Sequence, residues 1–114
     1  MSTRAATRGV ASTIQDAKTT GNGDVLAIPD SFRNHTLYIK GAADVSAGAI
    51  QPESADSYDY AGTWAPIGGG PVSVGNATEV VINFTGVYKF LRARISTTIS
   101  GGAAPSVTVK YVGS

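Results

Sequence analysis

Cysteine is absent from the 114 residues, and histidine occurs once, as His35. Without cysteine the chain has no disulfide framework, no thiolate metal site and no cysteine nucleophile. A single histidine excludes a two-histidine metal site, and no Gly-x-Ser-x-Gly segment accompanies it. We therefore expect no catalytic residue, no metal and no cofactor. We interpret His35 as a strand-end residue that makes a local hydrogen bond.

Long apolar runs are also missing. No apolar stretch approaches the ~18 residues that a membrane-spanning helix needs. The chain begins MSTRAATRGVASTIQD, which is small and polar and lacks the apolar region of a secretory signal. We expect a soluble protein without a secretory signal and without a membrane partner.

Charge of either sign is modest, and its distribution is more informative than its sum. The net charge of +1 argues against general nucleic-acid binding by bulk electrostatics. Residues 41–88 contain five acidic residues and no Lys or Arg, whereas residues 89–114 contain four basic residues and no acid. The chain therefore has an acidic middle and a basic end.

Short runs of Val, Ile, Thr and Tyr, bounded by Gly, Pro, Asn and Asp, are abundant and are typical of an all-β domain. No apolar pattern of helical period is sustained over three turns. Strands are expected within residues 24–29, 35–41, 48–54, 63–68, 77–86, 87–99 and 105–113. Seven or eight strands with one apolar face each need a covering sheet, so we predict a two-sheet antiparallel sandwich, either jelly-roll or immunoglobulin-like.

The first 20 residues do not share this pattern, because they are small, polar and basic, with Arg4 and Arg8 as their first charges. This composition is consistent with an arm that is loose alone and ordered on a partner. We predict a flexible basic N-terminal arm over residues 1–20 and a β-sandwich domain over residues 21–114. A tail without any role is the alternative.

One stretch, LRARI, alternates cleanly, with Leu91, Ala93 and Ile95 on one face and Arg92 and Arg94 on the other. No acid is near in the sequence, so the partner of the arginines lies elsewhere on the chain or on another molecule. An Arg–carboxylate pair across a subunit boundary would fix register and orientation. Pairing inside the monomer would instead join neighbouring strands. Both alternatives are open at this point.

The stretch ESADSYDYAGTW supplies candidate acids for this pairing: Glu53, Asp56 and Asp59. Acids in a loop are the ligand type that Ca²⁺ prefers, but these lack the spacing of an EF-hand loop. Two of them could in principle form a glycosidase pair, although nothing else in so short a chain would build the cleft. We interpret them as a solvated acidic loop that takes part in an interface.

The same stretch clusters Tyr58, Tyr60 and Trp64. Exposed aromatics on a sandwich loop can stack on sugar rings, as in carbohydrate-binding modules, and they also dominate protein–protein hot spots. Because Pro66 and Ile67 follow closely, we interpret Trp64 as a core residue. Tyr58 and Tyr60 are interpreted as interface residues.

The order of these segments resembles small β-sandwich virion proteins of tailed bacteriophages, over about Gly21 to Val112. In that family a Glu-x-Ser-x-Asp-like stretch precedes a Trp, and a Gly-x-Tyr segment runs into an Arg-Ala-Arg strand. The residues at those places are Glu53, Asp56, Trp64, Gly86, Tyr88, Arg92 and Arg94. The Tyr-rich insertion before the Trp and the basic arm depart from the pattern.

The resemblance implies a non-enzymatic virion structural protein, assembled in the host cytoplasm. We expect a capsid decoration, or cement, protein that binds the major capsid protein lattice as a symmetric homo-oligomer, a trimer. A neck, tail or fibre component and a carbohydrate-binding module are the alternatives. The expected interface residues are Arg4, Arg8, Glu53, Asp56, Tyr58, Asp59, Tyr60, Arg92 and Arg94.

Overall fold

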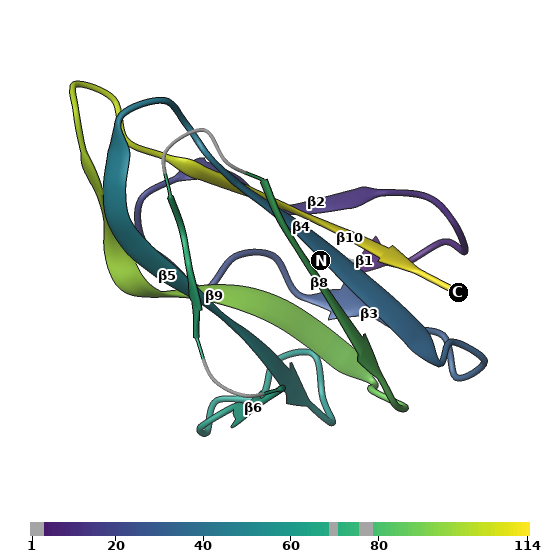
Figure 1. The fold of residues 1–114 in the computed structure, drawn as a ribbon. Helices are drawn as coiled ribbons and strands as arrows, with labels where there is room; N and C mark the ends of the chain where they lie inside the picture. The colour runs from purple at the N-terminus through teal and green to yellow at the C-terminus, as the bar shows by residue number, and fades with distance from the viewer. Residues whose placement is uncertain (1–3, 69–70, 76–78) are drawn as a thin grey trace.

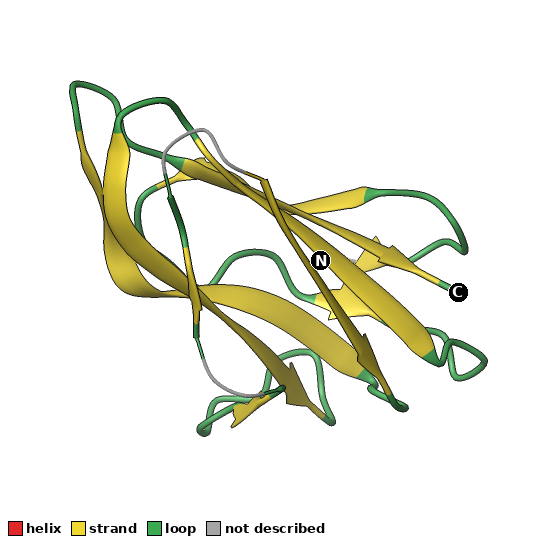
Figure 2. Cartoon of the chain, viewed as in Figure 1, coloured by secondary structure: helices red, strands yellow, loops and turns green. Residues whose placement is uncertain are grey.

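Two β-sheets pack face to face in this protein (Figure 1), and strands joined by loops make up its described part (Figure 2). The structure, a computed structural model, describes residues 4–68, 71–75 and 79–114. It confirms the predicted all-β, two-sheet sandwich. No helix in this part of the chain could cross a membrane. The strands are β1 (Arg4–Ala5), β2 (Ser12–Lys18), β3 (Leu26–Ala27), β4 (Asn34–Gly41), β5 (Val45–Ala55), β6 (Ala65–Pro66), β7 (Val72–Ser73), β8 (Glu79–Thr85), β9 (Phe90–Gly101) and β10 (Val107–Gly113).

The strands divide into a six-stranded and a four-stranded sheet. The first has the order β1-β3-β9-β5-β6, with β7 also paired to β5, and the second has the order β2-β10-β4-β8. All pairs are antiparallel except β1 with β3. Each of the seven expected ranges overlaps a strand. The strands β1 and β2 were not predicted because both lie in the expected arm, and the two-residue β7 falls outside the seven expected ranges.

The core lies between the sheets and is built by period-2 alternation. On β9, the predicted inward residues Leu91, Ala93 and Ile95 are buried. Opposite them, alternate residues of β4 and β10 point inward, and these include Leu37 and Tyr111, which are both fully buried. The alternation read from the sequence therefore assigns the faces of β9 correctly.

Strand β8 behaves differently from its neighbour β4. Val80, Ile82 and Phe84 alternate along it and pack against the core, but all three are only partly buried. The reason is position, because β8 is the last strand of its sheet and pairs only with β4 in the described part of the chain.

The structure corrects the predicted arm over residues 1–20 and its boundary with a domain from residue 21. Residues 1–3 lie outside the described residues, but β2 forms one side of the four-stranded sheet by pairing with β10. Ile14 is buried in the core, and the side chain of Gln15 donates hydrogen bonds to the carbonyl oxygens of Gly21 and Ala93. A strand with so few large apolar residues escapes composition analysis, although one buried Ile and a satisfied Gln suffice to anchor it.

Candidate interaction site

The two arginines of β9 share one carboxylate, that of Glu53 on β5. Glu53 and Arg92 are direct cross-strand partners. The Nε atom of Arg92 donates to Oε1 of Glu53, and the Nε atom of Arg94 donates to Oε2, each over 2.9 Å. The side chain of Glu53 is 6% exposed, that of Arg92 15% and that of Arg94 37%. Of the two pairings considered from the sequence, the structure has the one inside the chain.

This arrangement satisfies a buried charge from both sides. A carboxylate that loses its water needs charged donors on both oxygens, and Glu53 has one on each. Two guanidinium groups against one carboxylate leave a local excess of positive charge. That excess lies at the more exposed Arg94, at the rim of the cluster.

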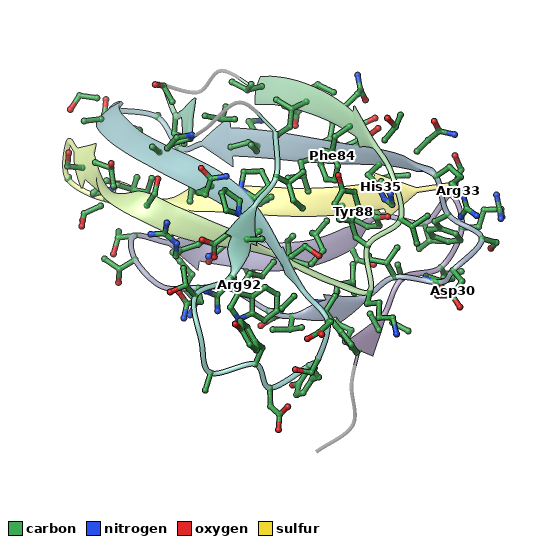
Figure 3. The ribbon with its side chains drawn as sticks, turned by 90° about the horizontal axis from the view of Figure 1, so that it is seen from below. Asp30, Arg33, His35, Phe84, Tyr88 and Arg92 are labelled. Carbon is green, nitrogen blue, oxygen red and sulfur yellow. The ribbon has the colours of Figure 1, made fainter. Side chains whose placement is uncertain are left out.

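Trp64 covers the first arginine. The guanidinium carbon of Arg92 lies 4.3 Å from the centroid of the Trp64 ring, which is a cation–π geometry. The indole Nε1 donates to the backbone oxygen of Tyr60 over 3.0 Å. Trp64 is buried, as predicted, but on the outer face of the six-stranded sheet and apart from the main core cluster. It therefore fixes the segment 56–64 on that face, below Arg92 in Figure 3.

Gln51 anchors the chain just after this segment, and nothing in the sequence pattern had singled it out. Its Nε2 donates to the backbone oxygen of Pro52 over 2.8 Å and to that of Ile67 over 3.4 Å. The backbone nitrogen of Ile67 donates to the oxygen of Pro52 over 2.9 Å. Gln51 and Ile67 are both buried, so the chain is also held just beyond the Trp64 end of the segment.

The other predicted residues of this segment lie at its surface. Asp56, Asp59 and Tyr60 are exposed. Tyr58 is partly buried, with its ring in edge contact with that of Phe90 at 6.4 Å. The segment thus presents an aromatic ring and two carboxylates at the surface. Their role in an interface stays a prediction.

Arg4 and Arg8 contact the sandwich itself. Arg4 pairs with Asp24 over 3.2 Å, with both side chains well exposed, so the pair contributes little to stability. Arg8 donates to the hydroxyl of Ser31 over 3.3 Å, and its guanidinium carbon lies 5.1 Å from the ring centroid of Phe32. The two arginines expected to reach a partner are therefore placed against β2, β3 and the loop that precedes β4.

A second cluster surrounds His35 at the end of the sandwich (Figure 3). Nε2 of this buried side chain lies 2.9 Å from the backbone oxygen of Gly86, and Nδ1 lies 2.6 Å from the hydroxyl of Tyr111. A carbonyl oxygen only accepts, so Nε2 carries the proton and Nδ1 accepts from Tyr111. Phe84 stacks on the imidazole at 5.2 Å, and Tyr88 meets it edge-on at 5.3 Å.

The prediction that His35 makes a local hydrogen bond is therefore wrong. Its partners are distant in the sequence, and they join β4 to β10 and to the turn between β8 and β9. One signal for this contact was present. Tyr111 falls on the inward face of β10, and a buried tyrosine hydroxyl needs a hydrogen-bond partner.

Tyr111 makes the stability of the fold depend on pH in the alkaline range. Burial raises its pKa from the ordinary 10.0 to about 12. The folded state holds this proton more tightly than the unfolded state, so the free energy of unfolding falls as the pH rises from 10.0 to about 12. Denaturant titrations over this range measure the fall. Tyr111→Phe should flatten it and the exposed-site control Tyr60→Phe should keep it, whereas equal slopes in both variants would contradict the assignment.

The two clusters contain six of the seven residues that carry the resemblance to virion proteins. The first cluster fastens the segment 56–64 to the outer face of a sheet, and the second fastens the turn between β8 and β9 to the end of the sandwich. Asp56 is the exception, because it is exposed. The six residues are Glu53, Trp64, Arg92 and Arg94 in the first cluster, and Gly86 and Tyr88 in the second.

The acids predicted to act together are separated. Glu53 is buried under its arginines, while Asp56 and Asp59 face solvent. Among the residues that the structure describes, no three His, Asp or Glu side chains gather as a metal site would require. A cavity of about 390 Å³ lies elsewhere, beside β2, and its charged lining residues are Asp16, Lys18 and Asp24.

Comparisons with known proteins add no assignment to this geometry. No protein-family model matches the sequence, and a search of curated proteins finds no significant match.

Proposed function

We propose that this chain is a non-enzymatic structural protein of a phage virion, and specifically a capsid decoration protein that binds the major capsid protein lattice. One observation carries the proposal. The residues that give the sequence its likeness to virion proteins hold surface segments onto the sandwich, and none of the six in the two clusters lines the cavity beside β2. Side chains used in this way serve a rigid binding scaffold, which is the requirement for a protein that stabilises a lattice.

The proposed contact surface is the segment 56–64 together with Arg94. Tyr60 is exposed at its centre. Tyrosine is enriched at protein interfaces relative to the rest of the protein surface, so an exposed tyrosine here is a candidate contact residue. The exposed Asp56 and Asp59 give the segment negative charge, and Arg94 adds positive charge, so the surface can be complementary to a partner of mixed charge. Trp64 holds the C-terminal end of the segment and Gln51 holds the chain just beyond it, which lowers the entropy lost on binding.

The alternative of a carbohydrate-binding module has less support from the same residues. A sugar-binding platform needs open aromatic faces. One face of Trp64 is occupied by the guanidinium group of Arg92, and the ring of Tyr58 is in contact with Phe90. Of the three clustered aromatic residues, Tyr60 is exposed, whereas Tyr58 is partly buried and Trp64 is buried.

The proposal predicts that the purified chain binds heads of the phage that encodes it, prepared from particles that lack the chain. Co-sedimentation at increasing protein concentration measures the affinity. Tyr60→Ala and Arg94→Ala should each weaken binding at least about tenfold, as removal of an interface hot spot does. Val10→Ala, at an apolar residue that is also exposed and lies in the turn before β2, is the control and should bind as the wild type does.

Two results would count against this assignment. Binding to isolated tails or necks, with none to heads, would favour the alternative virion location. Binding to no virion part would contradict the proposed function.

A further inference from the structure

The edges of the two sheets differ in how well they are protected. Exposed edge strands pair readily with other chains, and proteins protect them with short length, Lys, Pro or bulges. In the six-stranded sheet, the strands β1, β6 and β7 are two residues long, and β6 contains Pro66. In the four-stranded sheet, β2 has register shifts against β10 and ends at Lys18.

Strand β8 has none of these protections. It is seven residues long, EVVINFT, without Pro, Lys, Arg or Gly. Its register with β4 is unbroken from Asn34 and Thr85 to Lys40 and Glu79. In Figure 3 it runs along the margin of its sheet, next to β4. Among the described residues it is the long, regular edge of the molecule.

The peptide groups of β8 that face outward can be identified. Asn34 exchanges backbone hydrogen bonds with Ser114, so its peptide groups point toward β10. Because these directions alternate along a strand, the odd-numbered residues of β4 point their backbone N–H and C=O groups toward β8. There they form hydrogen-bonded pairs with Val80, Ile82 and Phe84. The remaining residues of β8 direct their N–H and C=O groups to the free edge: Glu79, Val81, Asn83 and Thr85.

Apolar side chains accompany this edge. Val80, Ile82 and Phe84 face the core but remain partly exposed, whereas Leu37 and Ile39 on the adjacent strand are fully buried. On the opposite face of the sheet, Val81 is 48% exposed. A strand laid against β8 would cover apolar surface on both faces as well as pair its backbone.

We infer that β8 pairs with β8 of a second copy of this chain, antiparallel about a two-fold axis at Ile82. This register opposes Glu79 to Thr85 and Val81 to Asn83, so it engages all four outward residues in hydrogen-bonded pairs. It also keeps the two Glu79 side chains at opposite ends, so no like charges oppose each other. The two four-stranded sheets become one continuous sheet, and the interface is isologous.

This inference goes beyond the virion proposal and does not depend on it, since it concerns how two copies meet in solution. It replaces the trimer expected from the sequence by a dimer. It also gives the arginines no role between copies, because Glu53 already pairs with both of them.

The test is solution mass by light scattering during gel filtration, at low and high salt. The wild type should show twice the 11.6 kDa of one chain at both salts, because backbone pairing and apolar contact are not screened as ion pairs are. Val81→Pro removes an outward N–H but keeps the bonds to β4, a position where proline is tolerated. It should halve the mass.

Val81→Lys provides a second variant that keeps the backbone intact and adds an edge lysine, and it should also halve the mass. Val10→Lys makes the same change at a residue that is 52% exposed outside the edge, and it should leave the mass doubled. Circular dichroism verifies that each variant is folded. A monomeric wild type, a trimer, a mass that falls at high salt, or a dimer retained by folded Val81→Pro and Val81→Lys would overturn the inference.

Discussion

Glu53→Gln is expected to lower the free energy of unfolding by about 3 kcal/mol. Removing one partner of a buried ion pair costs roughly 3–5 kcal/mol, because the remaining charge stays buried without compensation. Here the loss affects two guanidinium groups, since Arg92 and Arg94 both bond to Glu53. The partial exposure of Arg94 allows water to compensate part of the loss, which places the effect at the lower end of that range.

Urea denaturation measures this change, with Asp59→Asn as the matched control. Asp59 lies on the neighbouring segment but is exposed, so its neutralisation should change the free energy of unfolding by no more than about 0.5 kcal/mol. Arg94→Ala should fall between the two, because it leaves Glu53 with one of its two donors. Equal effects of Glu53→Gln and Asp59→Asn would show that the buried cluster does not stabilise the fold.

Gly101→Ala is expected to cost about 4 kcal/mol, because overpacking and a disfavoured backbone conformation each cost roughly 1–3 kcal/mol. Gly101 ends β9 at φ +130°, where side chains are rarely found. An added Cβ would lie 2.1 Å from the backbone oxygen of Asp44 and 2.6 Å from the backbone nitrogen of Ser46. Neither atom can rotate away as a side chain would, so the start of β5 must shift.

Gly9→Ala separates the two contributions. Gly9 also has positive φ, at +72°, but no atom lies within 4 Å of an added Cβ. Its substitution should therefore cost only the backbone part, roughly 1–2 kcal/mol. Thermal unfolding of both variants gives the comparison. A Gly101→Ala variant no less stable than Gly9→Ala would mean that β5 and β9 do not approach each other as described.

The sequence predicts the long strands well because their physics is local. Alternation of Leu91, Ala93 and Ile95 with two arginines assigns the faces of β9 without any knowledge of its neighbours. The same argument places Tyr111 in the core. It fails for β2, where a single large apolar residue, Ile14, is buried and the polar Gln15 is buried beside it.

The partner of the arginines could not be selected from the sequence. Five acids lie in residues 41–88, and the choice among them depends on the register of β5 against β9. That register shifts between Val45 and Ile50, and nothing local in the sequence fixes the size of the shift. Only the folded ladder opposes Glu53 to Arg92.

The contact between His35 and Tyr111 was missed for a related reason. The two residues are 76 positions apart, and they meet because β4 and β10 are neighbours in one sheet. Strand order is not encoded in any single strand. Burial of each residue could be inferred separately, but their pairing required the topology.

We propose a place for this chain on the head of a virion, and immunogold electron microscopy is the measurement that we would make first. An antibody raised against the purified chain is applied to intact particles of the phage that encodes it, with particles lacking the chain as the control. For a capsid decoration protein, we expect gold distributed over the faces of the head. Gold confined to the tail or neck, or particles that carry no gold although the chain is present in the infected cell, would contradict it.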